Sequence, residues 1–323
     1  MKGKFIISLD FELHWGVFDA LSLDKYKNNL LTVPEVVNRL LCLSETYNVK
    51  LTFATVGFLF AENKKELTDS FPKQIPSYLD SKLNPYQLMD KIGENETSDS
   101  LHYAKSLIEQ IKLNSNHEIS THTFSHYNCL ADGQSPKQFD EDINAAVHIA
   151  KTMGIELKSI VFPKNQINEE HLIICKKYGI TSYRGTEKHK LYNYPMFNTK
   201  GKRLLRLVDN YINISGSNTY PVHDLNPTPS GLINLPSSRF LRPYIPKLFF
   251  MEGLKRKRIK NAMGYAAKNN ELFHLWWHPH NFGSNIDENF KNLEDIFKTY
   301  KHLNDTYNFE SVTMTGLTQQ ILK

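Results

Sequence analysis

The sequence has few cysteines and no long apolar run. Its 323 residues include three cysteines, Cys42, Cys129 and Cys175. They are odd in number and have neither disulfide-framework nor zinc-finger spacing, which favours a reducing compartment. No stretch approaches the roughly 20 apolar residues of a membrane span. Residues 1–4 run directly into an apolar strand pattern, without the apolar core of a signal peptide. We therefore expect a cytoplasmic protein with no stable membrane insertion.

The sequence also lacks a strong excess of charge, an internal repeat and a low-complexity tract. Its formal net charge is +5 and its pI is about 8.8. This mild excess permits an anionic substrate, but no nucleic-acid-binding motif accompanies it, so we expect no nucleic-acid partner. One basic run, residues 255–260, has two interpretations. It either contacts an anionic lipid or a glycan phosphate, or it forms a solvated helix face.

The chain does contain alternating strand-like and helix-like segments. The patterns predict helices over residues 32–47, 98–113, 136–153, 169–178 and 287–303, and strands over 5–9, 50–57, 158–163, 179–184, 271–277 and 309–313. Another strand is expected in the first half of residues 117–126. With 40% hydrophobic residues, the chain can bury a substantial core. We expect one α/β domain over residues 1–323, with irregular excursions at about 60–97 and 186–260.

Three clusters of polar residues come where predicted strands end. They are Asp10 with Glu12, His122 with His126, and His278 with His280. Each has an alternative interpretation: solvated acids, an exposed histidine-rich turn, or interfacial aromatic residues. A barrel, however, gathers the carboxyl ends of its strands at one face.

The spacing within and between these clusters suits a metal. On a helical turn, residues four apart such as His122 and His126 have Cβ atoms about 6 Å apart, so two imidazoles can bind one divalent ion. A carboxylate with two imidazoles is a common set for a catalytic divalent metal. A further carboxylate and histidine suit a general base and a general acid.

The motifs around these clusters resemble those of a known family. Residues 117–126 read His-Glu-Ile-Ser-Thr-His-Thr-Phe-Ser-His, and residues 8–12 read Ser-Leu-Asp-Phe-Glu. Residues 53–57 and 313–315 are similar to other family segments. On these residues the chain resembles the polysaccharide deacetylases of the NodB-homology type, carbohydrate esterase family 4, in the branch with an Asp-x-Glu first motif. The resemblance covers nearly the whole chain and implies a distorted (β/α) barrel.

The resemblance also implies roles for individual residues. Glu12, His122 and His126 would hold one divalent ion, zinc first, with cobalt or nickel as alternatives. Asp10 would act as the general base on the metal-activated water, and His278 would protonate the leaving amine. Because Phe11 separates the two acids, the roles of Asp10 and Glu12 could be exchanged.

One departure concerns the third motif, in which the family has an arginine beside a proline. Residues 162–166 here read Phe-Pro-Lys-Asn-Gln. Lys164 and Arg184 are candidates for the missing cation, although Lys164 could equally be a solvated loop lysine. Our substrate-binding candidates are Trp15, Lys164, Arg184, Trp277 and His280. Trp15 could instead be a core residue, and His280 could pair with another site residue rather than line the substrate groove.

The function implied by the resemblance is metal-dependent N-deacetylation of an acetylated amino sugar. The sugar would belong to a glycan or to a nucleotide- or lipid-linked glycan precursor. Two alternatives on the same fold are a deformylase of a lipid-linked amino sugar and a ureide amidohydrolase. A third, of another class, is a catalytically inactive glycan-binding protein, which the missing arginine supports. The oligomeric state stays open.

Overall fold

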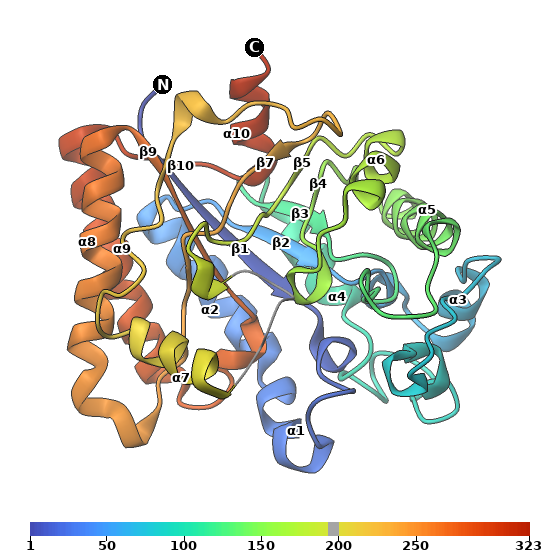
Figure 1. Ribbon diagram of the computed structural model, residues 1–323. Helices are drawn as coiled ribbons and strands as arrows, with labels where there is room; N and C mark the ends of the chain where they lie inside the picture. The colour runs from blue at the N-terminus through green and yellow to red at the C-terminus, as the bar shows by residue number, and fades with distance from the viewer. Residues whose placement is uncertain (193–199) are drawn as a thin grey trace.

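A curled sheet of mainly parallel strands forms the centre of the protein. The computed structural model describes residues 1–192 and 200–323. The sheet order is β6-β9-β1-β2-β3-β4-β5-β7, with β10 beside β1 and β8 beside β9 (Figure 1). The strands are β1 (Lys4–Phe11), β2 (Thr52–Thr55), β3 (Glu118–Thr121), β4 (Ser159–Ile160), β5 (Ser182–Tyr183), β6 (Tyr220–Pro221), β7 (Ile233–Asn234), β8 (Arg239–Phe240), β9 (Glu271–Trp277) and β10 (Glu310–Ser311). Among the strands of the described residues, β6 is the only one that pairs antiparallel with another strand, namely with β9.

Helices lie around the outside of this sheet (Figure 1). They are α1 (Leu23–Leu31), α2 (Val33–Tyr47), α3 (Lys64–Asp69), α4 (Lys105–Leu113), α5 (Pro136–Thr152), α6 (Glu169–Lys177), α7 (Lys200–Asp209), α8 (Glu252–Asn269), α9 (Ile286–Tyr307) and α10 (Met314–Ile321). None of the described helices is long and apolar enough to cross a membrane. The predicted fold, a distorted (β/α) barrel, is confirmed.

The position of β1 explains where polar side chains gather. All eight residues of β1 are buried, because β2 and β9 flank it and helices cover it. The register pairs Asp10 with Ala54 of β2 and Leu9 with Trp277 of β9. All these strands run parallel, so the residues that follow β1, β3 and β9 meet at one rim of the sheet. Asp10, Glu12, His122 and His278 are therefore brought together.

Some predicted elements are shorter than expected. The helix expected over 98–113 begins only at Lys105, because the Asp99 carboxylate accepts hydrogen bonds from the backbone of Gly93 and Leu101 and holds a turn there. The excursion predicted over 60–97 contains α3 and short 3-10 turns. The excursion over 186–260 is more regular than expected, because it contains the short strands β6, β7 and β8, the helix α7 and the start of α8.

The basic run 255–260 lies in α8, and the interpretation as a solvated helix face is wrong for Lys255 and Arg258, which are buried. Lys255 is buried and pairs with Glu252, while Arg258 is buried and pairs with Asp209 at 2.9 Å. Arg256 and Lys260 both pair with Asp295 of α9. Four of the five basic residues thus pair with acids of the protein, whereas Lys257 is exposed.

Candidate active site

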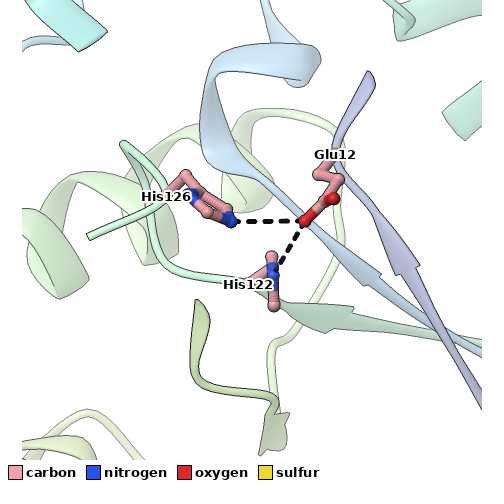
Figure 2. Close-up of side chains that lie close together, drawn as sticks. All are labelled: Glu12, His122 and His126. Carbon is pink, nitrogen blue, oxygen red and sulfur yellow. Dashed lines mark ion pairs between the residues drawn. The ribbon is translucent and has the colours of Figure 1, made fainter. Parts of the chain in front are cut away.

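Glu12, His122 and His126 lie together at the rim of the sheet (Figure 2). One carboxylate oxygen of Glu12, Oε2, lies 3.3 Å from Nε2 of His122 and 3.2 Å from Nε2 of His126. All three side chains are buried, and their donor atoms lie within 4.8 Å of one another. Three donors each about 2.1 Å from one ion would be roughly 3.0–3.4 Å apart. The group therefore has the size of a metal site.

The two histidines are held by an irregular loop, so the expected helical turn was wrong. Thr123 and His126 adopt positive φ angles of 64° and 55°, which are uncommon for residues other than glycine. The buried carboxylate of Asp142, on α5, accepts hydrogen bonds from the backbone N–H groups of Phe124 and Ser125 at 2.8 and 3.1 Å. These bonds hold the loop in the conformation that brings both imidazoles to Glu12.

The tautomer of His122 provides a test of whether a cation suits this group. Its Nδ1 lies 2.8 Å from the carbonyl oxygen of Val161, which can only accept a hydrogen bond, so Nδ1 carries the proton. In the neutral ring, Nε2 then presents a lone pair, and this buried atom has no hydrogen-bond partner among the described residues. A lone pair facing a carboxylate oxygen is unfavourable unless a cation lies between them. The donor set therefore fits a divalent ion.

A glycine makes room for the Glu12 carboxylate. A Cβ atom on Gly16 would lie 1.9 Å from Cδ of Glu12, far inside van der Waals contact. Burial opposes ionisation of Glu12, but the charge of His278 and the contacts with His122 and His126 outweigh it, so the pKa of Glu12 lies well below its usual range. The carboxylate is therefore both confined and ionised.

Asp10 is held by Arg184, which comes directly after β5. Arg184 donates from Nη1 to Oδ1 of Asp10 at 2.6 Å and from Nη2 to Oδ2 at 2.9 Å. It also donates to Ser8 and to Asn165, each at 3.0 Å. Burial raises the pKa of Asp10, but the charge and hydrogen bonds of Arg184 more than compensate and leave the pKa below its usual value. Arg184 thus supplies a guanidinium to Asp10, whereas residues 162–166 contain no arginine.

His278 lies between the two acids. Its Nε2 is 3.6 Å from Oδ2 of Asp10 and 3.5 Å from Oε1 of Glu12. Its Nδ1 lies 3.1 Å from the amide nitrogen of Asn281, and the Tyr26 hydroxyl donates to the other amide atom, Oδ1, at 3.0 Å. Through these contacts Tyr26 and Asn281 hold the His278 ring with Nε2 toward the two acids.

The remaining substrate-binding candidates lie elsewhere. Trp15 is fully buried against Phe58 and donates to the carbonyl of His102, so the core interpretation holds for it. Trp277 is also fully buried and stacks on Phe282. Neither tryptophan offers a surface to a sugar.

Lys164 and His280 do lie near the site. The ammonium group of Lys164 pairs with the Asp19 carboxylate, so the solvated-loop interpretation was wrong. His280 is buried, stacks on His278 with ring centroids 5.1 Å apart, and has Nε2 3.9 Å from Glu12. Its position favours pairing with site residues over lining a groove.

Several residues of this site were missed by the sequence analysis. Gly16 lies four residues after Glu12, and a glycine so near the first motif could have suggested that another group approaches its backbone closely. Trp276 lines a cavity beside His278 where Trp277 was expected. Tyr26 and Asn281 are 255 residues apart, and no sequence signal connects them.

Comparisons with known proteins bear on the fold and the family. The sequence matches the family model described as polysaccharide deacetylase over residues 17–183, just over half of the chain. A search of curated proteins found no match. A structure from Mycobacterium smegmatis, described as a polysaccharide deacetylase, is similar with a TM-score of 0.59 and 12% identity, covering 99% of this chain and 91% of that one.

Two further structures have other described activities. The α-amylase AmyC from Thermotoga maritima has a TM-score of 0.56 and 10% identity, covering 99% of this chain and 75% of its own. The PuuE allantoinase has a TM-score of 0.54 and 9% identity, covering 98% of this chain and 89% of its own. At these identities the likeness shows the fold alone. The family follows from the sequence match, whose residues include His122, His126 and Tyr183: the chain belongs to the polysaccharide deacetylase family.

Proposed function

We propose that this protein is a metal-dependent deacetylase that hydrolyses the N-acetyl amide of an amino sugar. The observation that carries the proposal is the grouping of Glu12, His122 and His126 beside the Asp10–Arg184 pair and His278 at one rim of the sheet. A site that only binds glycan does not need this set of ligands, base and acid.

Glu12, His122 and His126 would hold the ion, with zinc as the first candidate and cobalt or nickel as alternatives. When bound, such an ion polarises an amide carbonyl and lowers the pKa of a water molecule. Asp10 accepts a proton from the attacking water. Arg184 keeps Asp10 ionised and oriented through two hydrogen bonds. His278, which must be doubly protonated to act as an acid, donates a proton from Nε2 to the leaving nitrogen and becomes the neutral imidazole.

The contacts also favour one distribution of roles between the two acids. Glu12 lies within 3.3 Å of both histidine nitrogens, as a metal ligand would, whereas both oxygens of Asp10 are occupied by Arg184. This arrangement supports the Asp-x-Glu form of the first motif, with Asp10 as base and Glu12 as ligand. It also weakens the inactive alternative, because Arg184 provides the cation whose absence was the basis for that alternative.

The direct test is release of acid from N-acylated amino sugars by protein loaded with zinc or cobalt. We expect acetate release that stops with a chelator and returns with metal. The His278→Gln variant should retain metal and lose about 100-fold or more in kcat, as expected for a general acid. Formate release without acetate would favour the deformylase, and hydrolysis that resists chelation would contradict the proposal.

A further inference from the structure

A cavity adjoins the candidate active site and shares His278 with it. Its volume is about 290 Å³, and it is formed largely by the segments that follow β5, β8 and β9 and by α7. Its lining includes Phe240, Trp276, Arg206, Arg242 and Glu187. Because His278 borders both the cavity and the two acids, a molecule in the cavity would reach the reacting groups.

One wall of this cavity is aromatic. The rings of Phe240 and Trp276 have centroids 4.8 Å apart, and Trp276 lies 5.7 Å from the ring of His278. The guanidinium of Arg184, which also binds Asp10, lies 4.2 Å from the centroid of the Trp276 ring and helps to hold that ring in place. An aromatic face of this kind suits the C–H face of a sugar ring.

The second wall of the cavity includes two arginines, Arg206 and Arg242. Arg184, Arg239 and Arg258 are buried, and each pairs with a buried aspartate. Arg242 differs: among the described residues no carboxylate forms an ion pair with it, and no carboxylate is among the charges that act on its pKa. Burial lowers the pKa of Arg242, and the nearby charge of Arg206 acts in the same direction. A desolvated guanidinium beside a second one favours binding of an anion.

Glu187 is the one acid among the described residues that line the cavity. Its pKa is raised by burial, and the charges of Arg239 and Arg184 act on it in the opposite direction. Its negative charge is therefore balanced by arginines outside the Arg206–Arg242 wall. Its Oε1 is buried and has no hydrogen-bond partner among the described residues.

We propose that this cavity selects an amino sugar that carries an anionic group, a phosphate or a carboxylate, with Arg242 as the residue that recognises the charge. The proposal rests on the proposed function, because it places the sugar on Trp276 and its N-acyl group at His278. A guanidinium binds either anion through two parallel hydrogen bonds, so the structure defines the charge of the ligand rather than its source.

Three probes separate the possibilities: N-acetylglucosamine 1-phosphate, N-acetylmuramic acid and the neutral N,N′-diacetylchitobiose. Binding is measured by calorimetry on chelator-treated protein, in which turnover does not occur, and kcat/KM is measured on metal-loaded protein. We expect at least one anionic probe to bind about tenfold or more tightly than chitobiose. Preference for the first probe identifies a phosphate, and preference for the second identifies a carboxylate.

The Arg242→Met variant should weaken binding of the preferred anionic probe by about 10- to 100-fold and leave chitobiose binding unchanged. Arg203→Met, an exposed position on α7, is the matched control and should change neither. Equal binding of charged and neutral probes by the wild type, or equal weakening of all three by Arg242→Met, would overturn the proposal. Charge-selective binding without any acid release would instead retain the cavity's role and reject the deacetylase function.

Discussion

Replacing Arg184 with methionine should separate the base from the metal group. The change removes two hydrogen bonds to Asp10, at 2.6 and 2.9 Å, and leaves a carboxylate that is 3% exposed without its cation. Breaking a buried pair from one side costs about 3–5 kcal/mol. We therefore expect the free energy of unfolding to fall by about 3 kcal/mol. We also expect kcat to fall by about 100-fold, because Asp10 loses its orientation.

A double-mutant cycle with Asp10→Asn distinguishes this cause from general damage. The double variant has no buried charge left to neutralise, so it should be more stable than the sum of the two single changes predicts, by about 2 kcal/mol. Its activity should stay lost, because the base is gone. Stability is measured by urea denaturation, kcat by acid release, and metal content by elemental analysis.

Metal content is the control within this experiment. The hydrogen bonds that the Arg184 side chain donates within the described residues go to Ser8, Asp10 and Asn165. None reaches Glu12 or the two histidines, so the variants should bind metal as the wild type does. An Arg184→Met protein with near-normal kcat would refute the role of this pair, as would strictly additive destabilisation in the double variant.

Three further changes test the supports of the site. Gly16→Ala places a Cβ 1.9 Å from the Glu12 carboxyl carbon and should weaken metal uptake at least tenfold. Gly253→Ala, at a position with open space around it, should leave metal uptake unchanged. Equal metal uptake by the Gly16→Ala variant and the wild type would contradict this prediction. Asp142→Asn turns an NH₂ group toward backbone donors and should cost about 1–3 kcal/mol of unfolding free energy and lower metal affinity; unchanged denaturation curves would contradict it. Burial lowers the pKa of His171 to about 4, so its neutral form contributes stability above pH 6.5 that is lost as the pH falls toward 4. His171→Phe should reduce the loss of unfolding free energy between pH 7 and 4.5 by on the order of 2 kcal/mol, measured by urea denaturation at both pH values. If the variant loses as much unfolding free energy as the wild type, His171 has the same protonation in the folded and unfolded states, which would contradict this prediction.

Much of this site could be predicted because its residues lie next to strand ends. The strand expected over 271–277 has the same bounds in the structure, since its residues are apolar except for Glu271 and His274. The parallel arrangement then brings His278 to the first-motif acids. The motifs and the expected fold were therefore enough to predict that Glu12, His122 and His126 lie together.

Other features could not be read from the chain. β9 is largely buried on both faces, so no alternation of polar and apolar residues tells which tryptophan faces the cavity, and Trp277 was chosen where Trp276 lines it. The role of Arg184 depends on β5 lying across the sheet from β1, and the Tyr26–Asn281 contact depends on packing between distant segments. Such contacts follow from tertiary structure, which local patterns do not encode.

Metal stoichiometry tests the central claim most directly. Elemental analysis and zinc titration on the purified wild type should give about one equivalent of a divalent ion, the number one site of this kind holds. Glu12→Gln, His122→Ala and His126→Ala should each lose it, and His302→Ala, at an exposed position on α9, should keep it. A wild type that takes up no zinc, cobalt or nickel, or ligand variants that bind as well as the wild type, would contradict the account.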